Sequence, residues 1–229
     1  MQTVRRLYSV FPIKLPLSQS QLNAYKSLRL LSLQIDPQAF ISNYAREAAF
    51  ADDIWREWLD SPLKQTLIAS VTGTVQDTSV HEEERDDGDN ASVDSDPPSN
   101  AGTPEEAGEW VGMASIIGPS GIPSSILAPF SEAGVGANWQ IYGLYAMWVH
   151  PAHRGKGVGV QLIKACLEWV RANVDPAFSS VNDGYFEKVV ALLVYDDNVA
   201  GRALYSRTGF TELEEVSAEV GQRWMVSKV

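Results

Sequence analysis

The sequence predicts one mixed α/β domain. Strand-like and helix-like patterns alternate over residues 139–228, and a composition of 45% apolar and 21% charged residues is ordinary for a globular protein. The length of 229 residues suits a single domain, 1–229, that contains an insertion. A chain of this size and composition buries a substantial core.

Residues 76–108 differ in composition from the rest of the chain. They hold 11 Asp or Glu and one base, Arg85, so they carry a formal charge of −10 out of the chain's −11. They contain no aromatic residue, and such a segment cannot bury enough surface to offset the entropy of ordering it. We predict a disordered acidic insertion, which is either a solvated loop without a partner or an acidic segment that attracts a basic partner or substrate. The remaining chain is nearly neutral, which argues against a nucleic-acid-binding protein.

Residues 17–33 are predicted to form an amphipathic helix after a first strand at 3–10. A serine, Ser18 or Ser20, is placed to cap its first turn. The apolar side chains that recur at helical spacing are Leu22, Tyr25, Leu28 and Leu31.

One or two further helices are expected over 36–50 and 52–61, the second with Asp52 as its cap. Two β-rich segments, 66–73 and 109–118, then predict strands on either side of the acidic insertion. The insertion therefore joins two antiparallel neighbours as an oversized hairpin connection.

Residues 139–149 predict a long strand rich in aromatic and aliphatic side chains. Strict alternation sends every second side chain to the same face. One face would hold Tyr142, Leu144, Ala146 and Trp148, and the other Gly143, Tyr145, Met147 and Val149.

The chain continues as helix, strand, helix, strand and strand. Residues 160–173 predict a helix whose apolar stripe is Leu162, Ile163, Cys166, Leu167 and Val170. An apolar strand at 188–195 is followed by a short helix over 198–210 that Gly209 closes. The last two strands lie near 211–216 and 223–228.

The stretch "HPAHRGKGVGVQLI", residues 150–163, combines glycines and basic side chains at a turn between a strand and a helix. Glycines let the backbone approach a ligand, and the free amides of a helix N-terminus bind anions. Arg154 and Lys156 add positive charge, so a pyrophosphate is the expected occupant. A dinucleotide-binding G-x-G-x-x-G fits poorly and a P-loop is absent; a tight turn without a ligand stays open.

Two segments carry a resemblance to a known family. "LYAMWVHPAHRGKGVGVQLIKACLEWV" resembles motif A of the GCN5-related N-acetyltransferase (GNAT) superfamily, with Arg154, Gly157 and Gly159 in its R-x-x-G-x-G positions. "VYDDNVAGRALYSRTGF" is similar to the family's second acyl-CoA motif, with Asn198, Ala203, Tyr205 and Gly209-Phe210 in register. The resemblance covers nearly the whole chain outside 76–108. It implies a mostly antiparallel central sheet, splayed at its fourth strand and flanked by helices.

The resemblance also implies an acetyl-CoA-dependent N-acetyltransferase and assigns roles to single residues. The backbone of Met147, Trp148 and Val149 should bind the acetyl and pantetheine groups. Asn198 should contact the pantetheine arm, and Tyr205 should donate a proton to the departing thiolate. The pyrophosphate should be held by Arg154 and the amides of Gly155, Lys156, Gly157, Val158, Gly159 and Val160.

The general base is an open question. Members of the family that acetylate protein N-termini often carry a Glu five residues before the asparagine, and this chain has Leu193 there. The candidates are Tyr142, Tyr145, His150, Asp196 and an ordered water, with His150 also readable as a plain turn residue. Trp55 and Trp148 are candidates for lining the acceptor site, the alternative being that both are core residues.

The cysteine, histidine and apolar content of the chain limits the compartment, metal and membrane association that we expect. The single cysteine, Cys166, allows no internal disulfide and is expected in the core, which favours the cytoplasm, with the nucleus also open. The three histidines show no metal-ligand spacing, so no metal is expected. No run reaches the roughly 18 apolar residues of a membrane span. The acceptor amine stays open among a protein N-terminus, a lysine, a polyamine and a small amine. A homodimer is also possible from the sequence. The alternative function is a non-catalytic acyl-CoA-binding or regulatory module.

Overall fold

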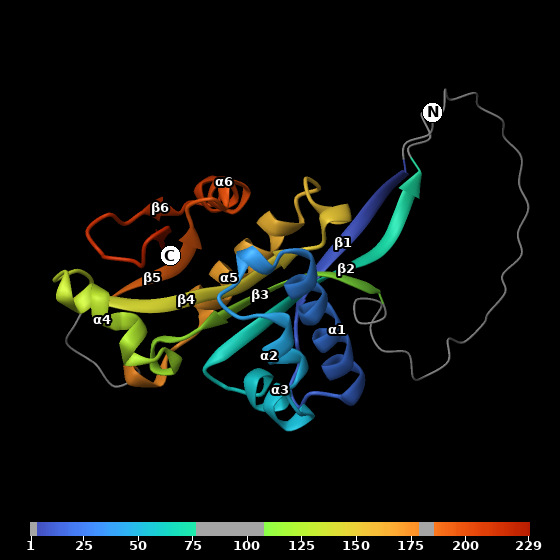
Figure 1. The fold of residues 1–229 in the computed structure, drawn as a ribbon, viewed down its shortest axis with the longest axis horizontal. Helices are drawn as coiled ribbons and strands as arrows, with labels where there is room; N and C mark the ends of the chain where they lie inside the picture. The colour runs from blue at the N-terminus through green and yellow to red at the C-terminus, as the bar shows by residue number, and fades with distance from the viewer. Residues whose placement is uncertain (1–3, 77–107, 179–185) are drawn as a thin grey trace, which may run out of the picture.

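A computed structural model describes residues 4–76, 108–178 and 186–229. A seven-stranded sheet forms its centre, with strand order β1-β2-β3-β4-β5-β7-β6 (Figure 1). The strands are β1 (Val4–Pro12), β2 (Lys64–Gln76), β3 (Glu109–Ile117), β4 (Trp139–Val149), β5 (Glu187–Tyr195), β6 (Thr211–Glu212) and β7 (Gln222–Lys228). The helices are α1 (Gln19–Ile35), α2 (Tyr44–Ala48), α3 (Asp52–Leu59), α4 (Ser124–Glu132), α5 (Val158–Ala172) and α6 (Val199–Arg207). Short 3-10 turns are η1 (Pro37–Ala39), η2 (Pro119–Gly121), η3 (Pro151–His153) and η4 (Pro176–Phe178).

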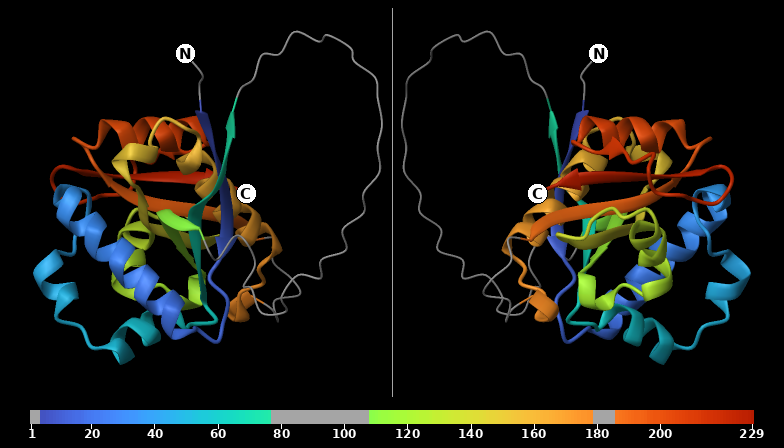
Figure 2. Two further views of the ribbon diagram at one scale, coloured as in Figure 1. Left: turned by 90° about the vertical axis from the view of Figure 1, so that its right-hand side faces the viewer. Right: turned by 90° about the vertical axis from the view of Figure 1, so that its left-hand side faces the viewer.

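Helices cover both faces of the sheet (Figure 2). On one face, the apolar stripe of α5 packs on β2 to β5 and forms the largest apolar cluster, which confirms the predicted stripe. On the other face, α1 and α3 pack with β1 to β3, and Trp55 and Leu22 are fully buried there. A third cluster on that second face centres on Phe130 of α4 and Trp224 of β7.

The sheet is mostly antiparallel, and β4–β5 is its parallel pair. This pairing joins Trp139–Gly143 to Glu187–Ala191 and stops there. Beyond Gly143, β4 continues beside β3 as far as Val149. The predicted splay at the fourth strand is therefore confirmed, and it leaves an opening between β4 and β5.

A bulge in β4 corrects the predicted alternation. The register with β3 shifts between Met113 and Ser115, and Ala146 has a φ of 51°. One extra residue moves every later side chain to the opposite face. Met147 and Val149 accordingly pack on the α5 face, and Trp148 packs against α1. The prediction is thus wrong for the last residues of the strand.

The structure confirms one predicted helix cap, corrects another and adds a helix that was not predicted. Ser18 caps α1 in a capping box with Gln21, as one of the two predicted serines. Asp52 does not cap α3; Ala51 is the N-cap, and the Asp52 carboxylate instead pairs with Lys26 at 2.5 Å. Helix α4 was not predicted from the sequence. Strands β2 and β3 pair antiparallel as expected, and the acidic residues 77–107 between them lie outside the described residues.

Candidate functional site

A cavity of about 590 Å³ passes through the opening between β4 and β5. Its α6 side is lined by Asn198 and Tyr205, together with Met147 and Val194. Its α1 side is lined by polar residues of α1, α2, β2 and β3 and by apolar residues of α4. The structure therefore brings four residues predicted at the site to one cavity: Tyr145, Met147, Asn198 and Tyr205. Trp55 and Trp148 do not line it and lie in the apolar core against α1.

Tyr205 stands on the α6 side with 9% of its surface exposed. Burial raises the pKa of its phenol to about 12, and the nearby Cys166 adds to this effect. The hydroxyl is therefore protonated at neutral pH and able to donate a hydrogen bond or a proton. Its ring packs against Phe210, at 5.9 Å between centroids.

Asn198 begins α6 and serves as its cap. Its Oδ1 accepts a hydrogen bond from the Gly201 amide at 2.9 Å. A Cβ on Gly201 would lie 2.7 Å from the Asn198 side chain, so the glycine permits this close approach. The cap leaves the Nδ2 amino group as the remaining donor of the side chain.

The turn between β4 and α5 has the conformation that an anion site requires. Gly155 and Gly157 have φ values of 70° and 83°, and a Cβ on either would meet nothing within 4 Å. The first helical bond of α5 runs from the Gln161 amide to the Gly157 carbonyl at 3.1 Å. The amides of Val158, Gly159 and Val160 precede it and lack an intrahelical partner, at the positive end of a 15-residue helix.

Gly159 has a different role from the other two glycines. A Cβ there would lie 2.9 Å from Leu204 Cδ2 and 3.3 Å from Met147 Cε. The absence of a side chain lets the start of α5 pack against α6 and β4. It therefore helps to position the turn next to the cavity.

Arg154 and Trp148 converge on Asp36 at the end of α1. The Trp148 indole N–H donates to Asp36 Oδ2 at 2.6 Å, and Arg154 forms an ion pair with the same carboxylate. Arg154 Nε also donates to the Val149 carbonyl at 2.9 Å. Lys156 Nζ donates to the Ala152 carbonyl at 2.8 Å. Arg154 thus joins α1, β4 and the glycine turn, a contact that the sequence did not predict.

His153 fixes the turn against β1. It is 2% exposed, its Nε2 lies 3.2 Å from Arg6 Nη1, and its Nδ1 lies 3.1 Å from the Tyr8 hydroxyl. A guanidinium only donates, so Nε2 accepts and Nδ1 carries the proton. Burial lowers the pKa of the imidazole, and the positive charge of Arg6 lowers it further.

None of the four residues predicted as a general base has the properties of a good one. Tyr142 is fully buried beneath α5. Tyr145 lines the cavity, but burial of its hydroxyl raises the pKa well above the usual range. The His150 Nδ1 accepts from the Ala152 amide at 3.2 Å, which confirms the turn reading. Asp196 pairs with Arg223 at 2.6 Å, and this hydrogen bond lowers the pKa of the carboxyl.

The α1 side contains a polar group that sequence reasoning missed. Arg29 and Glu47 form a buried two-pronged ion pair, with N–O distances of 2.9 and 2.7 Å. Nearby, the Ser115 hydroxyl lies 3.0 Å from Thr66 Oγ1 and is also a hydrogen-bonding partner of Tyr25 and Tyr145. The available signal was a polar interruption of the apolar stripe of α1, since Arg29 follows Tyr25 by four residues.

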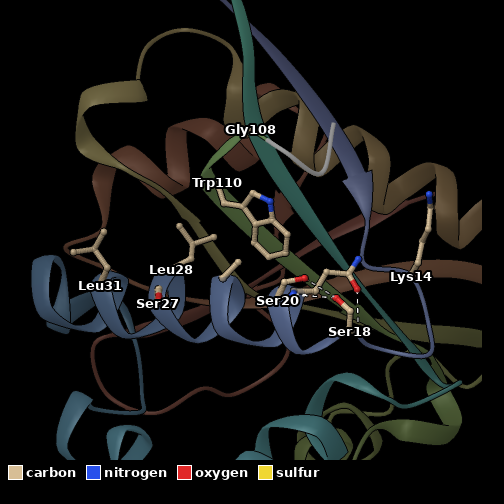
Figure 3. A pocket seen from close by; sticks show the side chains of 10 residues that line it. Lys14, Ser18, Ser20, Ser27, Leu28, Leu31, Gly108 and Trp110 are labelled. Carbon is tan, nitrogen blue, oxygen red and sulfur yellow. Dashed lines mark hydrogen bonds between the residues drawn. The ribbon is translucent and has the colours of Figure 1, made fainter. Parts of the chain in front are cut away.

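A second hollow, of about 640 Å³, lies along another face of α1 (Figure 3). Leu28, Leu31 and Trp110 form its apolar part, and Ser18 at its edge is engaged in the α1 cap. It contains none of the predicted site residues. Within the described residues, no group of three His, Cys, Asp or Glu side chains could hold a metal ion, and no helix has the length and apolarity that a membrane crossing requires.

The split sheet, the cavity through the split and the glycine turn at the end of β4 define an acyl-CoA N-acyltransferase fold. Residues 105–212 match the "Acetyltransferase (GNAT) domain" family. Over these residues the chain matches a GNAT domain, a fold that supports acyl-CoA-dependent acetyltransferase activity.

Solved structures of this family share the fold at low sequence identity. The GNAT domain of S. lividans PAT has a TM-score of 0.55 at 14% identity, over 99% of this chain and 97% of that chain. A GNAT-family acetyltransferase from Streptococcus pneumoniae has a TM-score of 0.52 at 12% identity, over 97% and 100%. A structure of the NatC complex bound to Gag peptide and CoA has a TM-score of 0.52 at 13% identity, over 97% and 98%. No curated protein matches the chain in sequence.

Proposed function

We propose that this protein transfers the acetyl group of acetyl-CoA directly to a primary amine. The observation that carries the proposal is the continuous cavity through the β4–β5 opening, which connects Tyr205 and Asn198 with the α1 side. A thioester that enters from the α6 side would meet an amine that enters from the α1 side. Holding both reactants in line supplies a large part of the rate enhancement.

The reaction is one addition and one elimination. The amine nitrogen attacks the thioester carbonyl, so a C–N bond forms and the C–S bond then breaks. The Tyr205 hydroxyl donates its proton to the departing thiolate, and the amine loses its proton to solvent. Beyond Gly143, the backbone of β4 has no β5 partner, and an amide there would stabilise the developing oxyanion by about 3 kcal/mol.

The glycine turn would hold the pyrophosphate. Gly155 and Gly157 leave open space around the backbone, and the amides of Val158 to Val160 are free for an anion. Met147 to Val149 and the Nδ2 group of Asn198 would contact the pantetheine arm. The arm would thus be held at both ends, with the thioester beside Tyr205.

Thiol release from acetyl-CoA in the presence of a panel of amines tests this proposal. We expect turnover by the parent protein and a loss of about 100-fold in kcat for Tyr205→Phe, since general acid catalysis is worth at least that factor. Thermal stabilisation by acetyl-CoA should be unchanged in this variant. Stabilisation of the parent by acetyl-CoA without turnover of any amine would instead identify an acyl-CoA-binding module, and stabilisation by NAD alone would contradict both functions.

A further inference from the structure

The α1 side of the cavity has apolar walls. Several large apolar residues of this wall come from the segment between α1 and α2, from α3, from β3 and from α4. They are Phe40, Ile41, Trp58, Ile117, Ile126 and Phe130. The whole cavity is near the middle of the size range for small-molecule sites, and an acyl-CoA arm would share it. The amine therefore needs a compact apolar body to fill this side.

Charged residues on this side are mostly positive. The charge of Arg29 is matched by Glu47. Arg46 and Lys64 also line the cavity, and within the described part of the chain neither side chain has an ion pair or a hydrogen bond. Burial lowers the pKa of Lys64, and the negative charge of Glu57 opposes this shift. The described lining thus has two cations in excess. Such a surface attracts an anionic group and repels additional ammonium groups.

Two hydrogen-bond donors without a partner in the described ranges belong to residues that line this cavity. Arg29 is 8% exposed, and its Nη1 has no hydrogen-bond partner among the described residues. The Ser42 hydroxyl is likewise buried without a partner there. Both residues line the cavity, and both groups donate hydrogen bonds. Buried donors without acceptors are costly in an empty site, and an oxygen of a ligand would satisfy them.

We infer that the acceptor is a compact apolar amine that also carries a carboxylate, and that Ser42, Arg29, Arg46 and Lys64 recognise this carboxylate. This inference rests on the proposed function. The carboxylate is bound by the Ser42 hydroxyl and Arg29 Nη1, in the field of Arg46 and Lys64. The same positive field favours the neutral form of a bound amine, so the free amine is available although none of the four predicted bases is suited to the role. Polyamines, which carry only positive charge, are poor substrates.

Matched pairs of amines test the inference through kcat/KM for thiol release. L-leucine and L-phenylalanine are compared with 3-methylbutylamine and 2-phenylethylamine, which lack the carboxylate, and with spermidine. We expect at least a tenfold preference for the two amino acids and no turnover of spermidine. The dipeptide amides Leu-Asp and Leu-Lys show whether the recognised carboxylate belongs to a free amino acid or to a peptide side chain. A preference for Leu-Asp over both Leu-Lys and free leucine assigns the carboxylate to a peptide side chain.

Two variants locate the recognition. Ser42→Ala and Arg46→Gln should each reduce about tenfold the ratio of kcat/KM for L-leucine to kcat/KM for 3-methylbutylamine. Ser27→Ala, on another face of α1, and Lys164→Gln, on the exposed face of α5, are the controls and should keep the parent preference. Equal turnover of amines with and without the carboxylate, a preference for spermidine, or an unchanged preference in both variants would overturn the inference while leaving the proposed function intact. Absence of turnover with every amine would refute the proposed function and this inference with it.

Discussion

Replacing Glu47 by glutamine would leave the Arg29 guanidinium buried without its counter-charge. Both side chains are almost fully shielded from solvent, with side-chain exposures of 9% and 0%, and they are joined at 2.9 and 2.7 Å. Removal of one partner from a buried pair typically costs 3–5 kcal/mol. Glutamine still accepts one of the two hydrogen bonds, so we expect Glu47→Gln to reduce the free energy of unfolding by about 3 kcal/mol.

Urea denaturation and thermal melting measure this loss. For a chain of this length, about 3 kcal/mol corresponds to a decrease of roughly 6–12 °C in Tm. The matched control is Glu187→Gln, because Glu187 forms a more exposed pair with Lys228 at 2.9 Å. An exposed pair contributes at most about 1 kcal/mol.

The double variant Arg29→Met with Glu47→Leu separates charge from packing. It removes both charges and keeps apolar volume at both positions, so it should lie within about 1 kcal/mol of the parent protein. If Glu47→Gln is no more destabilising than Glu187→Gln, or if the double variant is less stable than Glu47→Gln, the reasoning from an uncompensated buried charge is refuted.

Two further predictions concern the turn between β4 and α5. Gly157→Ala should lower the free energy of unfolding by about 1–2 kcal/mol, because alanine resists a φ of 83°. Gly159→Ala should instead destabilise the protein through the contact of its new Cβ with Leu204. In urea denaturation, Leu204→Val should therefore restore stability to the Gly159 variant and not to the Gly157 variant. His153 has a lowered pKa in the folded protein, so its contribution to stability is complete above the ordinary histidine value of about 6.5 and is lost as the pH falls below it. The decrease in Tm between pH 7.5 and 5.5 should be smaller in His153→Gln than in the parent protein, and His150→Gln should behave as the parent; equal decreases in all three would contradict the assignment.

The order of elements could be predicted from the sequence because each depends on local patterns. Leu22 and Tyr25 mark a helical stripe, Ser18 marks its first turn, and Gly209 ends α6 with a φ of 96°. The resemblance of one motif to a known family also implied that Asn198 and Tyr205 lie at one site, and both line the cavity. The helical stripe, its cap and the end of α6 each depend only on residues that are close together in the sequence.

The remaining features depend on contacts between distant segments. The bulge at Ala146 adds a single residue to an otherwise regular strand, and no residue type in the strand marks its place. The pairing of Arg29 with Glu47 requires α2 to fold back on α1, and Asp36 meets Arg154 only in the folded chain. Helix α4 was concealed by Pro129 within it, since proline is disfavoured inside helices. Sequence periodicity contains no information on these contacts.

Arg154 shows how a residue can match a motif and still require a separate test. The resemblance assigns it to the pyrophosphate, whereas the structure joins it to Asp36 and to the Val149 carbonyl. Lysine at this position keeps the charge but cannot make both contacts. If Arg154 braces the end of β4, Arg154→Lys should weaken binding of acetyl-CoA and of acetyl-pantetheine by a similar factor, roughly tenfold, because the strand that holds the pantetheine arm loses its support. Calorimetry with both ligands separates the two roles, since acetyl-pantetheine has no pyrophosphate; a loss confined to acetyl-CoA would assign Arg154 to the phosphates.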